Sequence, residues 1–208
     1  MPRIFVAVRA SESVTEAVRQ TQEALRSRVH DVKWVDTGNL HLTLRFFGAI
    51  DETRLQGVSH AVQSVAQLAK PFTVELAGVG CFPPKGRPRV IWVGIRQGAR
   101  PLVQLAQQLE QAFGEAGLGR EERPFRPHLT IGRLRGPDRR RGQRRSKKRF
   151  GPLNPEQAVP EIHQTLGLVS CGPLSMPVAS LQVVESELRP EGPHYTDRQV
   201  AELGRGGP

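Results

Sequence analysis

Hydrophobic and polar residues follow one another along this chain in two rhythms. Segments in which apolar residues alternate with polar ones, or form short runs bounded by turn residues, predict β-strands. Segments with apolar residues three and four positions apart predict amphipathic helices. The pattern predicts strands over residues 3–8, 33–35, 39–47, 72–79 and 89–95, another after Arg126-Pro127, and two closing strands over 178–188 and 194–201.

Four helices are predicted between these strands. The sequence Ser13-Val14-Thr15-Glu16 matches a capping box and predicts a helix from there to about residue 28. Further helices are predicted over 52–68, from Pro101 to about 116, and over 155–164. The elements do not alternate as parallel βαβ units do, so the predicted class is α+β with antiparallel sheets.

One tetrapeptide occurs twice. His41-Leu42-Thr43-Leu44 returns as His128-Leu129-Thr130-Ile131, 87 positions later (128 minus 41). In a strand the His and the Thr of each copy share a face, roughly 6–7 Å apart, while the apolar residues point to the core. The two copies predict two pseudo-symmetric lobes, each an antiparallel sheet packed with helices, around a central cleft.

The two copies also predict a chemistry. Two imidazoles with an ordinary pKa near 6.5 suit paired general acid and general base catalysis. Thr43 and Thr130 can donate hydrogen bonds to phosphoryl oxygens, and Arg133 adds a charged donor fork for the same anion. No carboxylate accompanies either His-x-Thr, so neither a metal nor another cofactor is expected. The residues alone do not distinguish the acid from the base.

Composition sets the remaining bounds. The chain has 208 residues, 38% of them hydrophobic, which suits a single domain over residues 1–208. It has no run of 18 apolar residues, and its apolar N-terminal stretch is too short for a signal peptide, so we expect a cytoplasmic protein that does not contact membranes. Cys81 and Cys171 stand apart, which favours reduced thiols without an assigned role.

The positive charge is concentrated in one stretch. Residues 139–149 hold eight basic residues and no acidic one, and subtracting these eight from the net charge of +10 leaves +2 for the rest. This stretch lies in a basic loop insertion predicted at about 135–155. Two interpretations are equally open: a solvated loop, or an RNA contact that adds salt-dependent affinity through Arg139, Arg140, Arg141, Arg144 and Arg145.

The motifs resemble those of a known family. Residues 39–48 (NLHLTLRFFG) and 125–133 (FRPHLTIGR) resemble the two signature motifs of the 2H phosphoesterases, and within them the RNA 2',3'-cyclic phosphodiesterases, also called 2'-5' RNA ligases or LigT-like proteins. The resemblance covers nearly the whole chain and thins over about 134–173. It implies a two-lobed α+β fold with the motifs lining a central cleft.

The resemblance also implies a reaction and roles. The implied reaction is metal-independent hydrolysis of RNA 2',3'-cyclic phosphate ends to 2'-phosphomonoesters. By resemblance, His41 is the proton donor to the leaving 3' oxygen and His128 the proton acceptor that activates water, while Thr43, Thr130 and Arg133 bind the phosphate. The expected partner is RNA with 2',3'-cyclic phosphate ends, and the expected state is a monomer.

Some residues and alternatives stay open. Phe46 is a candidate RNA contact because it and Trp34 could stack on a base, although such aromatic residues more often belong to the core. Tyr195 could reach the cleft. His30, His60, His163 and His194 are interpreted as structural residues. The alternative functions are 2'-5' RNA ligation on tRNA-like fragments and RNA binding without turnover.

Overall fold

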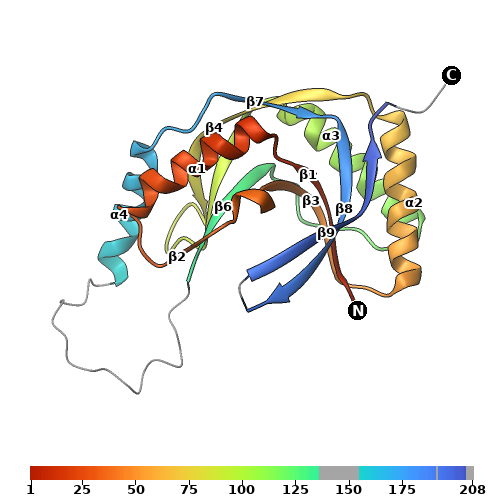
Figure 1. Cartoon of the computed structure of the whole chain (residues 1–208), viewed down its shortest axis with the longest axis horizontal. Coiled ribbons are helices and arrows are strands. Elements are labelled where there is room, and N and C mark those ends of the chain that lie inside the picture. The colour runs from red at the N-terminus through yellow and green to blue at the C-terminus, as the bar shows by residue number, and fades with distance from the viewer. Residues whose placement is uncertain (136–154, 191, 205–208) are drawn as a thin grey trace, which may run out of the picture.

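The computed structural model describes residues 1–135, 155–190 and 192–204, so the predicted basic loop lies almost wholly outside the described residues. A curled antiparallel sheet forms the centre, and the long helices lie on its outside (Figure 1). The elements in chain order are β1 (Arg3–Arg9), α1 (Glu12–Arg26), β2 (Val32–Trp34), the 3-10 helix η1 (Thr37–Asn39), β3 (His41–Ala49), α2 (Glu52–Leu68), β4 (Phe72–Phe82), β5 (Val90–Gln97), α3 (Ala99–Glu115), β6 (His128–Leu134), α4 (Pro155–Leu168), β7 (Leu174–Val178), β8 (Ser180–Arg189) and β9 (Gly192–Glu202).

The two central strands of the sheet carry the repeated tetrapeptide. The strand order is β7-β4-β5-β6-β3-β1-β8-β9, and β2 pairs with β6 beside this path. β3 and β6 are joined through one antiparallel register pair, Leu42 with Leu129, which are equivalent residues of the two copies. The sheet therefore divides at this pair into two similar halves, β3-β1-β8-β9 and β6-β5-β4-β7. The predicted α+β class with antiparallel pairing is confirmed.

The helices pack against the sheet in two pairs. α2 contacts α3, β8 and β9, whereas α1 contacts β7 and α4 contacts β4; α3 also contacts β4. In Figure 1 the first pair lies at the right of the sheet and the second at the left. α1 is tied to the central strand by buried Gln22, whose Nε2 donates to the carbonyl oxygens of Ile131 (2.9 Å) and Val35 (2.8 Å). These two bonds fix α1 and the end of β2 on β6.

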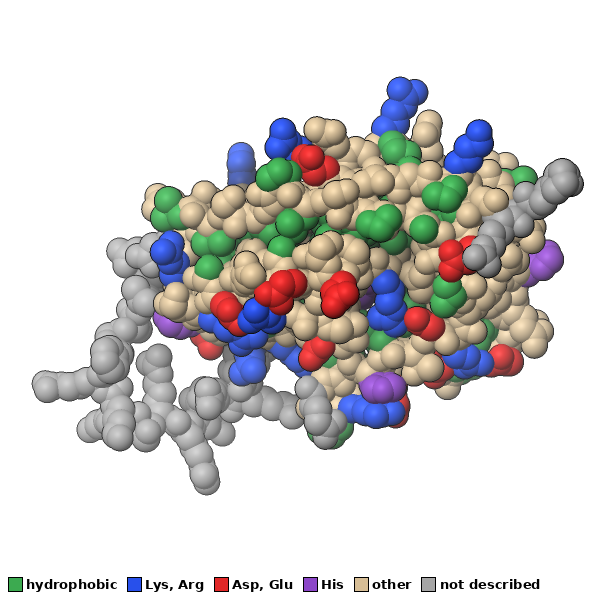
Figure 2. Space-filling model, turned by 45° about the horizontal axis from the view of Figure 1, so that its top comes forward, with side chains coloured by type: hydrophobic (Ala, Val, Ile, Leu, Met, Phe, Trp, Pro, Cys, Tyr) green, Lys and Arg blue, Asp and Glu red, His purple; other side chains and the backbone are tan. Residues whose placement is uncertain are grey.

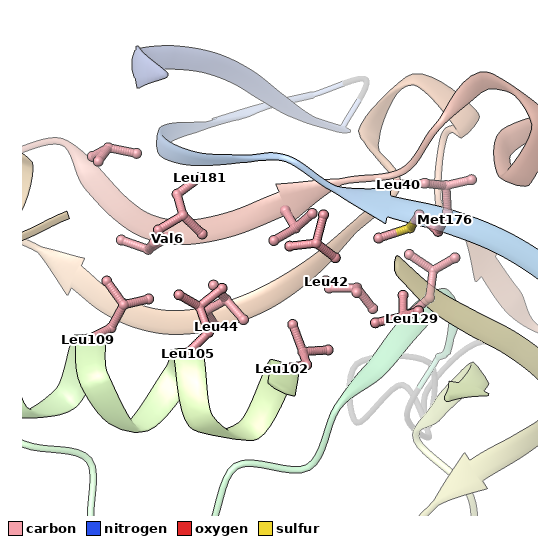
Figure 3. Close-up of a cluster of buried hydrophobic side chains, with 14 of the residues drawn as sticks. Val6, Leu40, Leu42, Leu44, Leu102, Leu105, Leu109, Leu129, Met176 and Leu181 are labelled. Carbon is pink, nitrogen blue, oxygen red and sulfur yellow. The ribbon is translucent and has the colours of Figure 1, made fainter. Parts of the chain in front are cut away.

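The apolar residues of both tetrapeptides point into the core, as predicted. Leu42, Leu129 and Ile131 have no exposed surface, and Leu44 is 7% exposed. Figure 3 shows core side chains of β3 facing α3, whose Leu102, Leu105 and Leu109 point toward the sheet. Burying a leucine side chain contributes about 1.5–3 kcal/mol, so these contacts anchor the motif strands from behind.

All four predicted helices are present, and α2 has the predicted bounds. The predicted capping box is wrong: Ser11 is the N-cap of α1, and the Glu16 carboxylate accepts hydrogen bonds from the Arg19 guanidinium. α3 also begins earlier than predicted, after Gly98, whose φ of 76° suits glycine. Pro101 is therefore its third residue.

Two strand predictions need correction. β3 begins at His41 because residues 37–39 form η1, which is capped by the Asp36 carboxylate accepting from the Gly38 N–H at 2.9 Å. β7 was not predicted, and Val178 ends it instead of opening the next strand. Pro177 removes a ladder donor and so argues against a strand, but β7 is an edge strand, where proline is tolerated.

Charges of both signs are interspersed on the face of the molecule shown in Figure 2. Charges of both signs also lie close together on α1, where Arg19 pairs with Glu16 and with Glu23. This face of the described chain does not form a continuous basic surface. Among the described helices, none is long and apolar enough to cross a membrane.

Candidate active site

The two motif histidines open their strands in the same way. His41 is the first residue of β3 and His128 the first of β6. In each ring, Nδ1 lies 2.7 Å from the carbonyl oxygen two residues earlier, that of Asn39 or Arg126. A carbonyl oxygen only accepts hydrogen bonds, so Nδ1 carries the proton and Nε2 has no part in this hydrogen bond.

The Leu42–Leu129 pair brings the two copies together. One step along this antiparallel register in each direction sets His41 opposite Thr130 and Thr43 opposite His128. Side chains that are directly opposite have Cβ atoms about 4.5–5.5 Å apart. Alternation therefore places both imidazoles and both hydroxyls on the face of the strand pair opposite to that of Leu42 and Leu129.

A cavity of about 830 Å³ opens over this face of the sheet. His41, Thr43, Thr130 and Arg133 line it, whereas His128 is not among the lining residues and lies across the strand pair from Thr43. The other lining residues come mainly from β1, β2 and the β8–β9 hairpin; they are Arg3, Phe5, Lys33, Trp34, Val35, Asp36, Asn39, Phe46, Ser186, Leu188, Arg189, Gly192, Pro193, His194 and Tyr195.

The strand β3 has a one-residue bulge directly after its Thr. Thr43 pairs with Ala7 of β1 and Arg45 pairs with Val6, so Leu44 is the extra residue. A bulge reverses which side chains face which side of a sheet. It turns Phe46 to the face of His41, where its ring is 49% exposed and lines the cavity.

The strand β6 has the equivalent bulge. Thr130 pairs with Trp92 of β5 and Gly132 pairs with Ile91, so Ile131 is the extra residue. Strict alternation from Thr130 would point Arg133 to the core, but the bulge returns it to the cavity side. Arg133 therefore occupies in one half the position that Phe46 occupies in the other, and this difference breaks the symmetry of the two copies.

Aromatic rings fix both imidazoles, and none of these contacts was predicted from the sequence. The Phe5 ring stacks on His41 with 4.8 Å between centroids, and Tyr195 meets His41 edge-on at 5.5 Å. The Phe82 ring meets His128 edge-on at 5.1 Å. The available signal was period-two alternation, which places Phe5 on the opposite face from the buried Ile4 and Val6.

Burial and charge act on both imidazoles in the same direction. Burial lowers the pKa of His41 and of His128 from the usual 6.5, and the hydrogen bond to the backbone carbonyl opposes this in part. The positive charges of Arg9, Arg133 and the other imidazole lower the pKa of His41 further, and Arg133 also lowers that of His128. Burial and the nearby positive charges therefore both favour the neutral form of each ring in the ligand-free protein.

The aromatic candidates differ in their surroundings. The Phe46 ring has the Arg3 guanidinium 5.5 Å from its centroid, and Trp34 has that of Arg26 at 5.7 Å. Trp34 lines the cavity but also packs against the core, where Gly132 leaves room for its ring. The candidate contacts Arg139, Arg140, Arg141, Arg144 and Arg145 lie outside the described residues.

The remaining histidines and cysteines take no part in this site, apart from His194 on the cavity wall. His163 in α4 lies 3.3 Å from the Cys81 thiol, and burial raises the pKa of the Cys81 and Cys171 thiols. Within the part of the chain that the structure describes, no three His, Cys, Asp or Glu side chains are grouped as metal ligands.

An antiparallel sheet in two similar halves, with one His-x-Thr at the start of each central strand, defines the class of the 2H phosphoesterases. Comparison with family models agrees, because the model of the 2'-5' RNA ligase superfamily matches residues 6–167. The chain belongs to this family.

Curated relatives and solved structures match over almost the full length. The RNA 2',3'-cyclic phosphodiesterase of Methanothermobacter thermautotrophicus is 33% identical over 97% of this chain and 98% of its own. That of Archaeoglobus fulgidus is also 33% identical, over 96% and 99%. The crystal structure of TT0787 of Thermus thermophilus superposes with a TM-score of 0.74 and 28% identity, covering 97% of this chain and 98% of that one. Apo LigT of E. coli, at 24% identity, covers 98% and 99% with a TM-score of 0.70 and so shows the same fold.

Proposed function

We propose that this protein hydrolyses 2',3'-cyclic phosphate ends of RNA to 2'-phosphomonoesters by general acid–base catalysis with two imidazoles. The observation that carries the proposal is the Leu42–Leu129 register, which joins the strands of the two His-x-Thr copies beside a cavity lined by His41, Thr43 and Thr130. Relatives named RNA 2',3'-cyclic phosphodiesterase, at about one-third identity over nearly the whole chain, support the substrate class.

The reaction needs one proton acceptor and one proton donor. Nε2 of His128 takes a proton from water as the water oxygen attacks phosphorus in line with the P–O3' bond. Nε2–H of His41 gives a proton to the leaving O3', so a 3' hydroxyl and a 2'-phosphomonoester result. The direction of transfer follows the family resemblance, and exchange with solvent restores both rings afterwards.

The phosphoryl oxygens carry the charge of the transition state. Thr43 and Thr130 donate hydroxyl hydrogen bonds to the non-bridging oxygens, and Arg133 adds its guanidinium. The cyclic phosphate is itself an anion, so its binding raises the pKa of the nearby imidazoles. This favours the protonated His41 that the donor role requires, and it opposes the lowering of the His41 pKa by burial in the free protein.

Hydrolysis of adenosine 2',3'-cyclic phosphate in excess chelator tests the proposal. The expected product is the 2'-phosphate, resolved from the 3'-phosphate by chromatography. His41→Ala and His128→Ala should each lower kcat/KM about 10²–10⁴-fold. His60→Ala, in an exposed histidine of α2, is the matched control and should leave it unchanged. Turnover that persists in both motif variants contradicts the proposal.

Ligation is a second candidate, because the family description itself is 2'-5' RNA ligase. A 5'-hydroxyl RNA end would then take the place of water, and the same two imidazoles would transfer the protons. A joined 2'-5' product that forms only when both His41 and His128 are present would support it. Absence of joining at high concentrations of both ends would leave hydrolysis alone.

We also propose that the protein acts as a monomer, since one chain carries both His-x-Thr copies. Its expected place of action is the cytoplasm. A specific activity that does not change with protein concentration, together with a monomeric mass in solution, is the expected result.

A further inference from the structure

Two cations stand directly opposite one another on the cavity wall. Lys33 of β2 and Arg133 of β6 are partners in the antiparallel register, and both line the cavity. Cross-strand partners have Cβ atoms about 4.5–5.5 Å apart, and like charges at this distance destabilise a sheet. Among the described residues, neither cation has a carboxylate within 4.0 Å.

The other charged groups of the cavity are already engaged. The Arg189 guanidinium pairs with the Glu187 carboxylate at 2.7 Å, and the Arg3 guanidinium lies over the Phe46 ring. The Asp36 carboxylate accepts from a backbone N–H to cap η1. Lys33 and Arg133 thus keep donors for a ligand, and a bound anion between them would offset their repulsion.

The position of Lys33 separates it from the reacting phosphate. Arg133 follows Thr130 by three residues, which is up to about 10 Å along a strand. Lys33 lies beyond Arg133 on β2, and its Nζ is 3.8 Å from the point where a Cβ on Gly192 would sit, so it reaches to the β8–β9 hairpin. The cavity therefore offers one anion position at the His-x-Thr copies and another, one step further, at Lys33.

We propose that Lys33, beside Arg133, binds the phosphate on the 5' side of the terminal nucleotide and so makes the enzyme select RNA ends over free cyclic nucleosides. The inference rests on the proposed function, because the first anion position is taken to hold the cyclic phosphate. The ligand chemistry is a 5'-phosphomonoester or an internucleotide phosphodiester. Arg133 lies between the two positions and contacts the reacting phosphate.

Three substrates separate these cases: adenosine 2',3'-cyclic phosphate with a free 5' hydroxyl, its 5'-phosphorylated form, and the dinucleotide ApA with a 2',3'-cyclic end. We expect kcat/KM to be about 10-fold higher for one or both phosphate-bearing substrates than for the first, mainly through KM. The phosphate-bearing substrate with the higher kcat/KM identifies the ligand of Lys33: the 5'-phosphorylated nucleotide indicates a monoester, and ApA indicates a diester.

Variants of Lys33 connect this advantage to one side chain. Lys33→Gln should bring the ratio of kcat/KM between phosphate-bearing and free substrates close to one. For the phosphate-bearing substrates, the dependence of kcat/KM on salt concentration should also fall by the equivalent of about one phosphate contact. Lys33→Arg should retain the ratio. Lys70→Gln, at an exposed lysine after α2 that does not line the cavity, should leave both the ratio and the basal activity unchanged.

Two results would overturn the inference: a wild-type protein that does not favour the phosphate-bearing substrates, or a Lys33→Gln variant that loses activity equally on all three.

A binding measurement tests the role of Lys33 separately from the proposed catalytic function. Adenosine 2'-phosphate should bind about 10-fold more weakly than its 5'-phosphorylated form, and only Lys33→Gln should remove the difference. Failure of all three substrates to turn over would refute the proposed function, while this difference in Kd would still decide the role of Lys33.

Discussion

Leu42→Ala tests the contact that holds the two His-x-Thr copies together. Leu42 has no exposed surface, lies between β1 and β6, and faces the leucines of α3. Truncating a buried leucine costs about 2.7–5.0 kcal/mol, more where the surroundings cannot collapse into the space. Two flanking strands and a helix limit collapse here, so we expect about 4 kcal/mol. With a urea m-value of about 2 kcal/mol/M, the midpoint should fall by about 2 M at unchanged m.

The matched control is Leu68→Ala at the end of α2, where the side chain is 87% exposed and the expected change is within about 0.5 kcal/mol. Leu129→Ala should resemble Leu42→Ala, and the double variant should deviate from additivity by about 0.5–3 kcal/mol because the two residues are register partners. A loss from Leu42→Ala no greater than that of the control, or strict additivity of the pair, would refute the central register.

The remaining predictions concern charge. Arg133→Ala should lower kcat/KM about 10²–10³-fold and move both limbs of the pH profile to higher pH, because its charge lowers the pKa of both imidazoles; Arg133→Lys should recover part of each effect. Glu110→Gln removes the charged partner of Arg45, whose side chain is only 11% exposed, and should lower the free energy of unfolding in urea by about 2 kcal/mol. Glu23→Gln, in an exposed ion pair of α1, is the control and should lower it by less than about 0.5 kcal/mol. Deleting 139–149 should weaken RNA binding and its salt dependence while turnover of a cyclic mononucleotide persists; unchanged binding would favour a solvated loop.

The sequence predicted the parts of the site that depend on local pattern. The alternation placed Leu42 and Leu129 in the core, and it placed His41 and Thr43 on one face, where both line the cavity. The bounds of α2 followed from its helical periodicity and from Pro71 beyond its end, and the structure adds a cap at its start, where the Asp51 carboxylate accepts from the Arg54 N–H. Local signals of this kind act within one element and need no knowledge of its neighbours.

The parts that depend on pairing between strands were not predictable. The bulges at Leu44 and Ile131 exist only against β1 and β5, and they decide that Phe46 and Arg133 face the cavity. Lys33 and Arg133 likewise lie opposite one another only because β2 pairs with β6 at residues 132–134, whereas β3 pairs with β6 at Leu129. Alternation alone would have pointed Arg133 into the core, so its expected place beside the phosphate came from the chemistry of its guanidinium and from the family resemblance.

The pH dependence of 2',3'-cyclic nucleotide hydrolysis tests the pair of imidazoles most directly. The substrate keeps its charge across this range, so the limbs belong to the enzyme. Because burial and Arg133 lower the pKa of both His41 and His128, the profile of kcat/KM should be a bell with its maximum below pH 6.5, falling as pH rises through neutral. The alkaline limb of kcat should lie higher, since the bound anion raises the pKa of the donor. A single rising limb, with activity maintained above neutral pH in both profiles, would contradict paired acid and base catalysis.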